Sequence, residues 1–195
     1  MNTRLIAIFV LLTLNGCINS GPKHNLDFSQ IENLNQLSGT YINRGEPRGQ
    51  LLSGILFGWA SIDSNTGQGK IDHSDIELIQ VSAAENNITV SAIRNGCVVY
   101  SRLFVLHRDF EITNGKIQVS KEIALLARGA GDVLFGPSYS KDEIGLDTGQ
   151  DAKFRHTGGL AGLVFLIIPV AGYEQNDVRF ERTLSDGVYN TCKSR

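Results

Sequence analysis

The chain has 195 residues, of which 42% are hydrophobic, and its formal net charge at pH 7 is −2. This hydrophobic content argues against general disorder, and the length is sufficient for one domain with a substantial core. The 18 Lys and Arg residues are balanced by 20 Asp and Glu residues without a basic stripe, which argues against nucleic acid as a partner.

The first sixteen residues have the layout of a secretory signal peptide. Arg4 supplies a positive charge, residues 5–14 form an almost unbroken apolar run, and Gly16 provides a small residue before Cys17. The run is much shorter than the roughly twenty apolar residues that a spanning helix needs. We therefore expect residues 1–16 to be removed, so that the mature chain begins at Cys17.

The end of this segment, Leu14-Asn15-Gly16-Cys17, resembles the lipobox of bacterial lipoproteins. The resemblance implies that the Cys17 thiol is acylated, that the new N-terminus carries further acyl chains, and that these chains anchor the protein to the membrane. In such lipoproteins an Asp after the Cys retains the protein at the inner membrane. Ile18 stands at that position here, which implies an outer-membrane anchor and a domain facing the periplasm. The alternatives are a plain secreted protein and a core helix with a buried thiol at Cys17.

The segment after the cysteine predicts a tether. Residues 17–36 contain the structure-breaking pair Gly21-Pro22 and are mostly small or polar. Ser29 and Glu32 have the spacing of a capping box, which predicts one short helix within this spacer. We expect the segment to hold the domain clear of the lipid headgroups.

One amphipathic segment follows at residues 51–59. Its apolar residues share one face of a helix, and they are Leu51, Leu52, Ile55, Leu56 and Trp59. We interpret this segment as a short helix that plugs one end of a barrel. The alternatives are a lid over an apolar pocket and a wedge that touches the membrane.

The rest of the chain, residues 37–195, predicts a single β-rich domain. Apolar and polar residues alternate with a period of two between residues 75 and 126, and the pairs Asn95-Gly96 and Asn114-Gly115 are strong hairpin signals. Shorter strand candidates follow at residues 133–135, 143–146, 152–156, 163–168 and 178–184. The pattern predicts an all-β fold in which an antiparallel meander forms a barrel or half-barrel, with one or two short helices.

Two further stretches carry weaker resemblances. Residues 37–46, taken with residues 162–172, resemble a group of bacterial lipoproteins without an assigned activity. Gly39-Thr40-Tyr41, followed by the meander, resembles the opening of lipocalin-type barrels, in which Gly-x-Trp begins the first strand. Tyr41 stands in place of that Trp. The second resemblance implies a barrel that carries a lipid or another apolar ligand.

Residues 158–172 form the most apolar stretch of the mature chain. Pro169 and four glycines argue against a long helix. We expect a strand that is buried on both faces. A loop that dips into the bilayer or grips a partner is the alternative.

Two cysteines remain in the mature chain, Cys97 and Cys192. An export signal places them in a compartment that permits disulfides, so we expect a bridge between them, with two free buried thiols as the alternative. Two cysteines alone are a poor zinc site, because zinc takes three or four protein ligands.

No catalytic, cofactor-binding or metal-binding motif stands out, so we expect no enzyme, no cofactor and no metal. The sequence favours a non-enzymatic role, in which the protein holds an envelope protein or an apolar ligand near the membrane. A ligand carrier requires a hollow lined by side chains such as Phe104, Phe135 and Phe154, with the 51–59 helix at its mouth. A structural role requires these side chains to fill the interior. An enzyme requires a cleft that joins one His to distant Asp or Ser residues.

Overall fold

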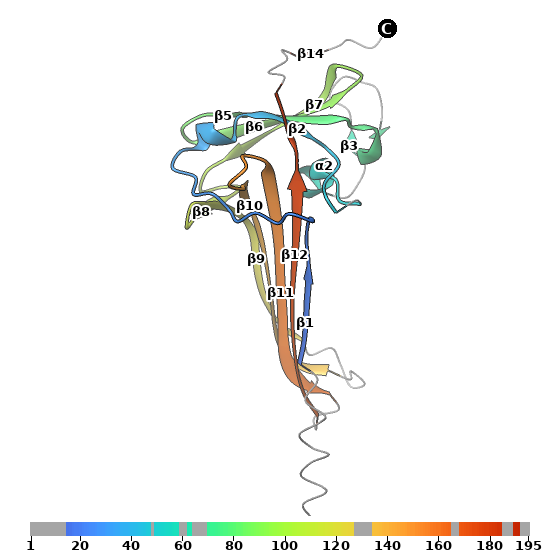
Figure 1. Ribbon diagram of the computed structural model, residues 1–195, viewed down its shortest axis with the longest axis vertical. Helices are drawn as coiled ribbons and strands as arrows, with labels where there is room; N and C mark the ends of the chain where they lie inside the picture. Colours follow the sequence, from blue (N-terminus) through green and yellow to red (C-terminus); the bar gives the residue numbers. More distant parts are fainter. Residues whose placement is uncertain are drawn as a thin grey trace, which may run out of the picture. The chain divides into compact units, whose positions relative to one another are not determined.

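The computed structural model describes residues 15–47, 49–58, 62–63, 70–126, 134–164, 168–184 and 189–191. These residues are mostly β-strand, which confirms the predicted all-β fold class. Two six-stranded sheets contain nearly all of the strands (Figure 1), and within the described residues neither sheet closes into a barrel. The described part of the chain has one α-helix and two 3₁₀ helices. None of these helices has the length and the apolar composition that a membrane crossing requires.

The first sheet contains the longest strands, and its order is β1-β12-β11-β10-β9-β8. Figure 1 shows β9 to β12 as long strands, with β1 beside β12. The strand β1 runs parallel to β12, whereas β8 and β9 form an antiparallel hairpin. The bounds are β1 Asn15–Ser20, β8 Glu111–Thr113, β9 Lys116–Leu126, β10 Leu134–Leu146, β11 Ala152–Val164 and β12 Ile168–Phe180.

The second sheet has the order β13-β2-β5-β6-β7-β14, and β3 pairs with β4 in a separate two-stranded sheet. The bounds are β2 Gly39–Ile42, β3 Ile62–Asp63, β4 Lys70–Ile71, β5 Leu78–Ala83, β6 Asn87–Arg94, β7 Cys97–Val105, β13 Arg182–Thr183 and β14 Asn190–Thr191. The helices are the 3₁₀ helices η1 (Leu34–Leu37) and η2 (His73–Asp75) and the α-helix α2 (Leu52–Phe57).

Both predicted hairpin turns are present. Asn95 and Gly96 join β6 to β7 with φ angles of 52° and 71°, and Asn114 and Gly115 join β8 to β9 with φ angles of 53° and 68°. Two consecutive positive φ angles define the turn that matches the twist of a two-residue hairpin, and Asn-Gly adopts them at the least cost. The local sequence therefore determines the register of both hairpins.

The chain divides into two compact units, and the single β-rich domain expected for residues 37–195 stays a prediction. Unit 1 contains β1 together with segments 120–142 and 155–176, and unit 2 contains segments 21–119, 143–154 and 177–195. The physical reason is strand length. The strands β10, β11 and β12 have 13 residues each, about twice the usual five or six, and each contributes residues to both units.

Residues 21–36, within the segment expected to be a tether, belong to unit 2 and pack into its core. Ile31 is 6% exposed and Leu34 is 3% exposed, and both belong to the hydrophobic core of this unit. The backbone N–H of Ser29 donates to the carbonyl oxygen of Leu146 at 2.8 Å, and that of Ile31 donates to Gly115 at 2.9 Å. The two apolar side chains and these hydrogen bonds stabilise the docked segment. The short helix of this region is η1, which begins at Leu34, five residues after Ser29.

Candidate functional site

Unit 2 contains an apolar hollow of about 80 Å³. Side chains from both sheets and from α2 surround it, and nearly all of them are hydrocarbon. The residues that line it are Leu37, Tyr41, Leu52, Leu56, Val81, Ile88, Val90, Phe104, Asp109, Phe110, Ile117, Val119, Ile144, Gly145 and Ala152. Val119 is 41% exposed, and Leu56 and Phe104 are half-buried, so this side of the hollow reaches the surface of the unit.

The helix α2 contributes two of the predicted residues to this hollow, Leu52 and Leu56. Leu52 is 2% exposed, whereas Ile55 and Leu56 are half-buried and pack against the core. Phe57 adds an edge-to-face contact with Tyr100 at a ring-centroid distance of 5.0 Å. The predicted apolar helix is therefore present and sits at the hollow.

The two other residues predicted for this segment have different positions. Leu51 precedes α2 and pairs with Arg44 through an isolated β-bridge. Trp59 lies outside the described residues. The helix itself ends at Gly58, whose φ angle of 89° is disfavoured for side-chain-bearing residues and whose N–H donates to the carbonyl oxygen of Gly54.

Asn43 fixes the start of α2, a role that sequence reasoning missed. Its side chain is 0% exposed, and its Oδ1 accepts a hydrogen bond from the backbone N–H of Ser53 at 2.8 Å. Its Nδ2 donates to the carbonyl oxygens of His73 and Ile76, both at 2.9 Å. A buried amide whose donors and acceptor are all used holds α2 and η2 in one arrangement. Only the position of Asn43 directly after the β2 strand signals this role in the sequence.

Two polar side chains border the hollow, and both are occupied by the protein itself. The hydroxyl of Tyr41 donates to the carbonyl oxygen of Leu37 at 2.8 Å, and burial raises the pKa of Tyr41 to about 12. The Asp109 carboxylate accepts from the Arg108 guanidinium and from the backbone N–H of Val105, both at 2.8 Å, and these bonds lower its pKa. The hollow therefore offers hydrocarbon contact and little hydrogen bonding.

Of the three phenylalanines predicted for a ligand hollow, only Phe104 is among its lining residues. Phe154 is half-buried and packs against the core. The side chain of Phe135 lies outside the described residues. The alternation along the strands predicted that these side chains point inward. It carried no information on whether they line the hollow or pack in the core.

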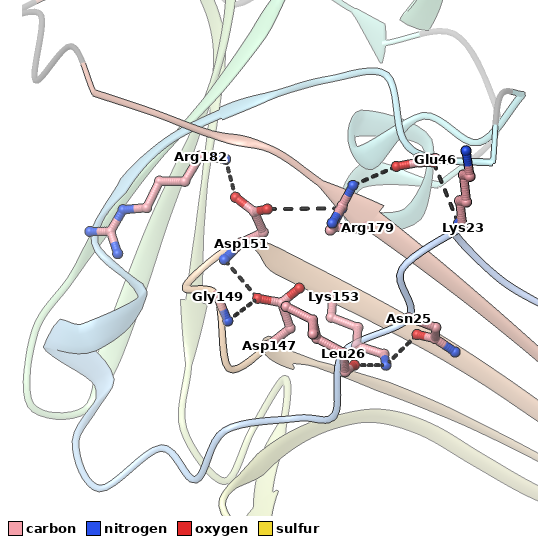
Figure 2. A network of polar contacts seen from close by, with 10 residues as sticks. All are labelled: Lys23, Asn25, Leu26, Glu46, Asp147, Gly149, Asp151, Lys153, Arg179 and Arg182. Carbon is pink, nitrogen blue, oxygen red and sulfur yellow. Dashed lines mark hydrogen bonds and ion pairs between the residues drawn. The ribbon is translucent and has the colours of Figure 1, made fainter.

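A buried polar network lies in unit 2 beside the N-terminal segment (Figure 2). The side chain of Lys153 is 2% exposed, and its Nζ lies 3.1 Å from Oδ2 of Asp177, whose side chain is 0% exposed. The same Nζ donates to Oδ1 of Asn25 at 2.7 Å and to the carbonyl oxygen of Leu26. Asn25 in turn donates to Asp177 at 2.8 Å. All three N–H groups of the ammonium have acceptors, as a buried lysine requires.

The network continues through two aspartates (Figure 2). Oδ1 of Asp147 accepts the backbone N–H groups of Gly149 and Asp151 at 2.8 and 3.1 Å. Asp151 accepts the backbone N–H of Arg182 at 2.8 Å and lies 3.9 Å from Nε of Arg179. These contacts hold the turn between β10 and β11 against β12 and β13. These carboxylates all have partners within the protein, and their contacts stabilise the turn and the strands around it.

Unit 1 carries a separate cleft of about 480 Å³ against β1, β10, β11 and β12. Gly158, Gly159 and Gly172 leave part of its wall without side chains. The other side chains of its wall include Ser138, Tyr139, Ser140, His156, Tyr173 and Glu174. The cleft thus joins one His to acidic and hydroxyl groups, which is the arrangement that the enzyme hypothesis requires.

Both ring nitrogens of His156 face carboxylates. Its Nδ1 lies 2.6 Å from Oδ1 of Asp142, and its Nε2 lies 3.5 Å from Oε1 of Glu174. A histidine that acts as a general base needs one nitrogen directed at the substrate. The imidazole of His156 therefore bridges carboxylates on the two neighbouring strands, β10 and β12. In the part of the chain that the structure describes, no group of three or more His, Cys, Asp or Glu residues is arranged to hold a metal ion.

No protein-family model, no curated protein and no solved structure matches this chain.

The cysteines occupy two different settings. Cys17 is a free, exposed thiol on β1. Cys97, at the start of β7, is disulfide-bonded. Its predicted partner Cys192 lies outside the described residues, and the pairing of the two stays a prediction. The segment just before Cys192 is described, and Asn190 pairs with Cys97 in the parallel ladder of β14 and β7.

Proposed function

We propose that this chain is a lipid-anchored protein of the bacterial envelope that holds the end of a hydrocarbon chain in the hollow of unit 2. One observation carries the proposal: the hollow is lined by hydrocarbon side chains, its two polar neighbours are occupied internally, and α2 lies at it. This arrangement favours the carrier hypothesis over a purely structural role, in which the same side chains would fill the interior.

The size and chemistry of the hollow select the ligand class. An apolar cavity of about 150 Å³ stays dry and binds benzene, so a hollow of about 80 Å³ accepts a few methylene groups rather than a whole lipid. Each buried methylene contributes about 0.8 kcal/mol. The ligand would therefore place the end of one acyl chain between Leu56 and Phe104, while its polar head stays outside.

The anchor is supported by the lipobox and by the setting of Cys17. The residues Leu14, Gly16 and Cys17 match the motif, and the thiol of Cys17 is exposed and unpaired with another cysteine. One acyl chain holds a protein to a membrane marginally, whereas two or more hold it stably. Ile18 after the cysteine supports an outer-membrane location with the domain in the periplasm.

We expect the chain recovered from its own bacterial membrane to lack residues 1–16 and to carry acyl chains on Cys17. Mass spectrometry of the N-terminal peptide measures this directly. A Cys17→Ser variant should leave the membrane fraction, because it removes the acylated thiol. An unmodified Cys17, or a Cys17→Ser variant that stays in the membrane fraction, would contradict the proposed anchor.

We expect native mass spectrometry of the extracted protein to show an adduct of lipid mass beyond the N-terminal acyl groups. A Leu56→Trp variant fills the hollow and should weaken lipid binding by about 5- to 100-fold, and so reduce the adduct, since overfilling a packed site costs about 1–3 kcal/mol. Leu103→Trp is the matched control, because Leu103 lies on β7 and is 51% exposed, away from the hollow lining. Equal adducts in both variants would contradict the hollow as the ligand site. A discrete protein partner without lipid would instead support an assembly role.

A further inference from the structure

Three neighbouring strands of unit 1, β10, β11 and β12, carry charged residues up to one common level along their length and none beyond it. Asp142 on β10, His156 on β11 and Glu174 on β12 lie side by side at this level, as the two contacts of His156 show. Past it, residues 134–140 on β10 and residues 157–173 between His156 and Glu174 contain no charged side chain. The level therefore separates a charged part of three neighbouring strands from an uncharged part.

Past this level, side chains alternate between an exposed face and a half-buried face. On β12, Pro169, Ala171 and Tyr173 are exposed, whereas Val170 and Gly172 are half-buried. This is the period of two that a strand imposes on its side chains. The exposed set, called here the tyrosine face, comprises Pro137, Tyr139, Ala161, Leu163, Pro169, Ala171 and Tyr173. One expectation from the sequence is thus corrected, because the apolar stretch 158–172 is not buried on both faces.

Close contacts place these residues on the same side of the sheet. A Cβ added to Gly159 would lie 2.3 Å from Cε1 of Tyr139, so Tyr139 shares the face of Gly159, and alternation along β11 adds Ala161 and Leu163. A Cβ on Gly158 would lie 2.9 Å from Oε1 of Glu174. Glu174 therefore belongs to the opposite face, and its neighbour Tyr173 belongs to the tyrosine face.

The side chain of Cys17, the lipobox cysteine, lies on the tyrosine face as well. In the parallel pairing of β1 with β12, Cys17 is the partner of Tyr173 and Ile18 is the partner of Glu174. Paired residues on neighbouring strands direct their side chains to the same side of a sheet. The thiol of Cys17 thus shares a face with Tyr173 and lies at the level where the charged residues end.

We propose that the tyrosine face of β10, β11 and β12 lies in the hydrocarbon layer of the bilayer to which Cys17 is anchored. This inference rests on the proposed acylation of Cys17, which brings lipid to this level of the sheet. Tyr139 and Tyr173 then occupy the interface, where aromatic rings with a polar end are favoured. Pro169 lies four residues past Tyr173, about 13 Å at 3.3 Å per residue, which is about the thickness of one hydrocarbon leaflet.

The test uses the full chain, purified with its acyl groups and reconstituted into phosphatidylcholine vesicles, with and without bromine on the lipid chains. A Leu163→Trp variant places a fluorophore on the tyrosine face. Leu160→Trp is the matched control, because Leu160 lies on the opposite face beside Gly172. Trp59 is the one native Trp, and its signal is subtracted with the parent protein. We expect brominated lipid to quench the added emission of Leu163→Trp by about half, and that of Leu160→Trp much less, because bromine quenches only at contact within the hydrocarbon layer.

Equal quenching of the two variants, or no quenching of Leu163→Trp, would overturn the inference. If the N-terminal peptide is acylated in the same preparation, the proposed anchor still stands. An unmodified N-terminal peptide would instead overturn the anchor, and the inference with it. Ala161→Trp reports on the same face and replaces Leu163→Trp if that variant fails to fold. A protein partner or a second copy on this face would exclude lipid and give the overturning result.

Discussion

Replacing Lys153 with Met will lower the free energy of unfolding by about 3–5 kcal/mol, which chemical denaturation measures. The variant removes the ammonium and leaves the Asp177 carboxylate buried without its ion pair. It also removes the donor to Asn25 and to the carbonyl oxygen of Leu26. The loss is large because a buried charge without its partner cannot regain its hydration.

Two control variants separate this effect from a general loss of charge. Lys153→Met combined with Asp177→Asn removes both charges, so it should recover part of the lost stability. Asp75→Asn breaks the exposed pair between Asp75 and Arg94, which are 3.9 Å apart, and it should cost at most about 1 kcal/mol. A Lys153→Met variant as stable as Asp75→Asn would contradict the structural role of the buried pair.

The buried pair also links the proposed anchor to the fold. Asn25 and Leu26 lie eight and nine residues after Cys17, and both contact Lys153. Lys153 and Lys116 further enclose the Phe28 ring, each with Nζ 5.1 Å from the ring centroid. The chain that follows Cys17 is thus held in unit 2 by hydrogen bonds of Asn25 and Leu26 and by the cation–π contacts of Phe28.

Local signals predicted the short-range parts of the fold. Asn95-Gly96 and Asn114-Gly115 predicted hairpins, and the positive φ angles of all four residues confirm them. The apolar face of residues 51–59 predicted a helix, and α2 occupies residues 52–57. A hairpin turn and a helical period both depend on residues that are close together in the sequence. The local sequence is therefore sufficient to predict them.

Strand length and the assignment of interiors were not predictable in this way. The candidates 163–168 and 178–184 were drawn as separate short strands, whereas β11 and β12 have 13 residues each. The strand candidate at residues 152–156 stops short of Gly158 and Gly159, but both glycines lie within β11, where they make room for Glu174 and Tyr139. A glycine that ends a strand and a glycine that accommodates a neighbouring side chain look the same in a single sequence.

Only the apolar residues of the candidate site were predictable from the sequence. The helix positions Leu52 and Leu56 and the strand position Phe104 were identified from their periodicity, and all three line the hollow. Lys153 and Asp177 carried no sequence signal, because their partners lie 128 and 24 residues away along the chain. Polar residues in a β-rich sequence are expected at the surface, and only the tertiary fold shows which ones are buried in pairs.

Replacing Cys97 with Ala will lower the free energy of unfolding by about 4 kcal/mol, because the predicted bridge to Cys192 would close a loop of nearly one hundred residues. The structure shows Cys97 in a disulfide and pairs Asn190 and Thr191 with Cys97 and Val98. The strand β14 has only two residues, so its ladder supplies few hydrogen bonds. A covalent link at its end would stabilise its pairing with β7.

Matched variants test the pairing itself by chemical denaturation. Cys97→Ala, Cys192→Ala and the double variant should lose the same stability, since each removes one and the same bridge. Cys17→Ser should leave the free energy of unfolding unchanged, because Cys17 is a free thiol on the exposed part of β1. Losses that add up in the double variant would show that the two cysteines contribute independently, and a peptide map without a linked Cys97–Cys192 pair would contradict the bridge. Agreement among the three variants would show that a disulfide bond fixes the β14 edge of the second sheet. Such a bond forms in the oxidising compartments that exported chains enter.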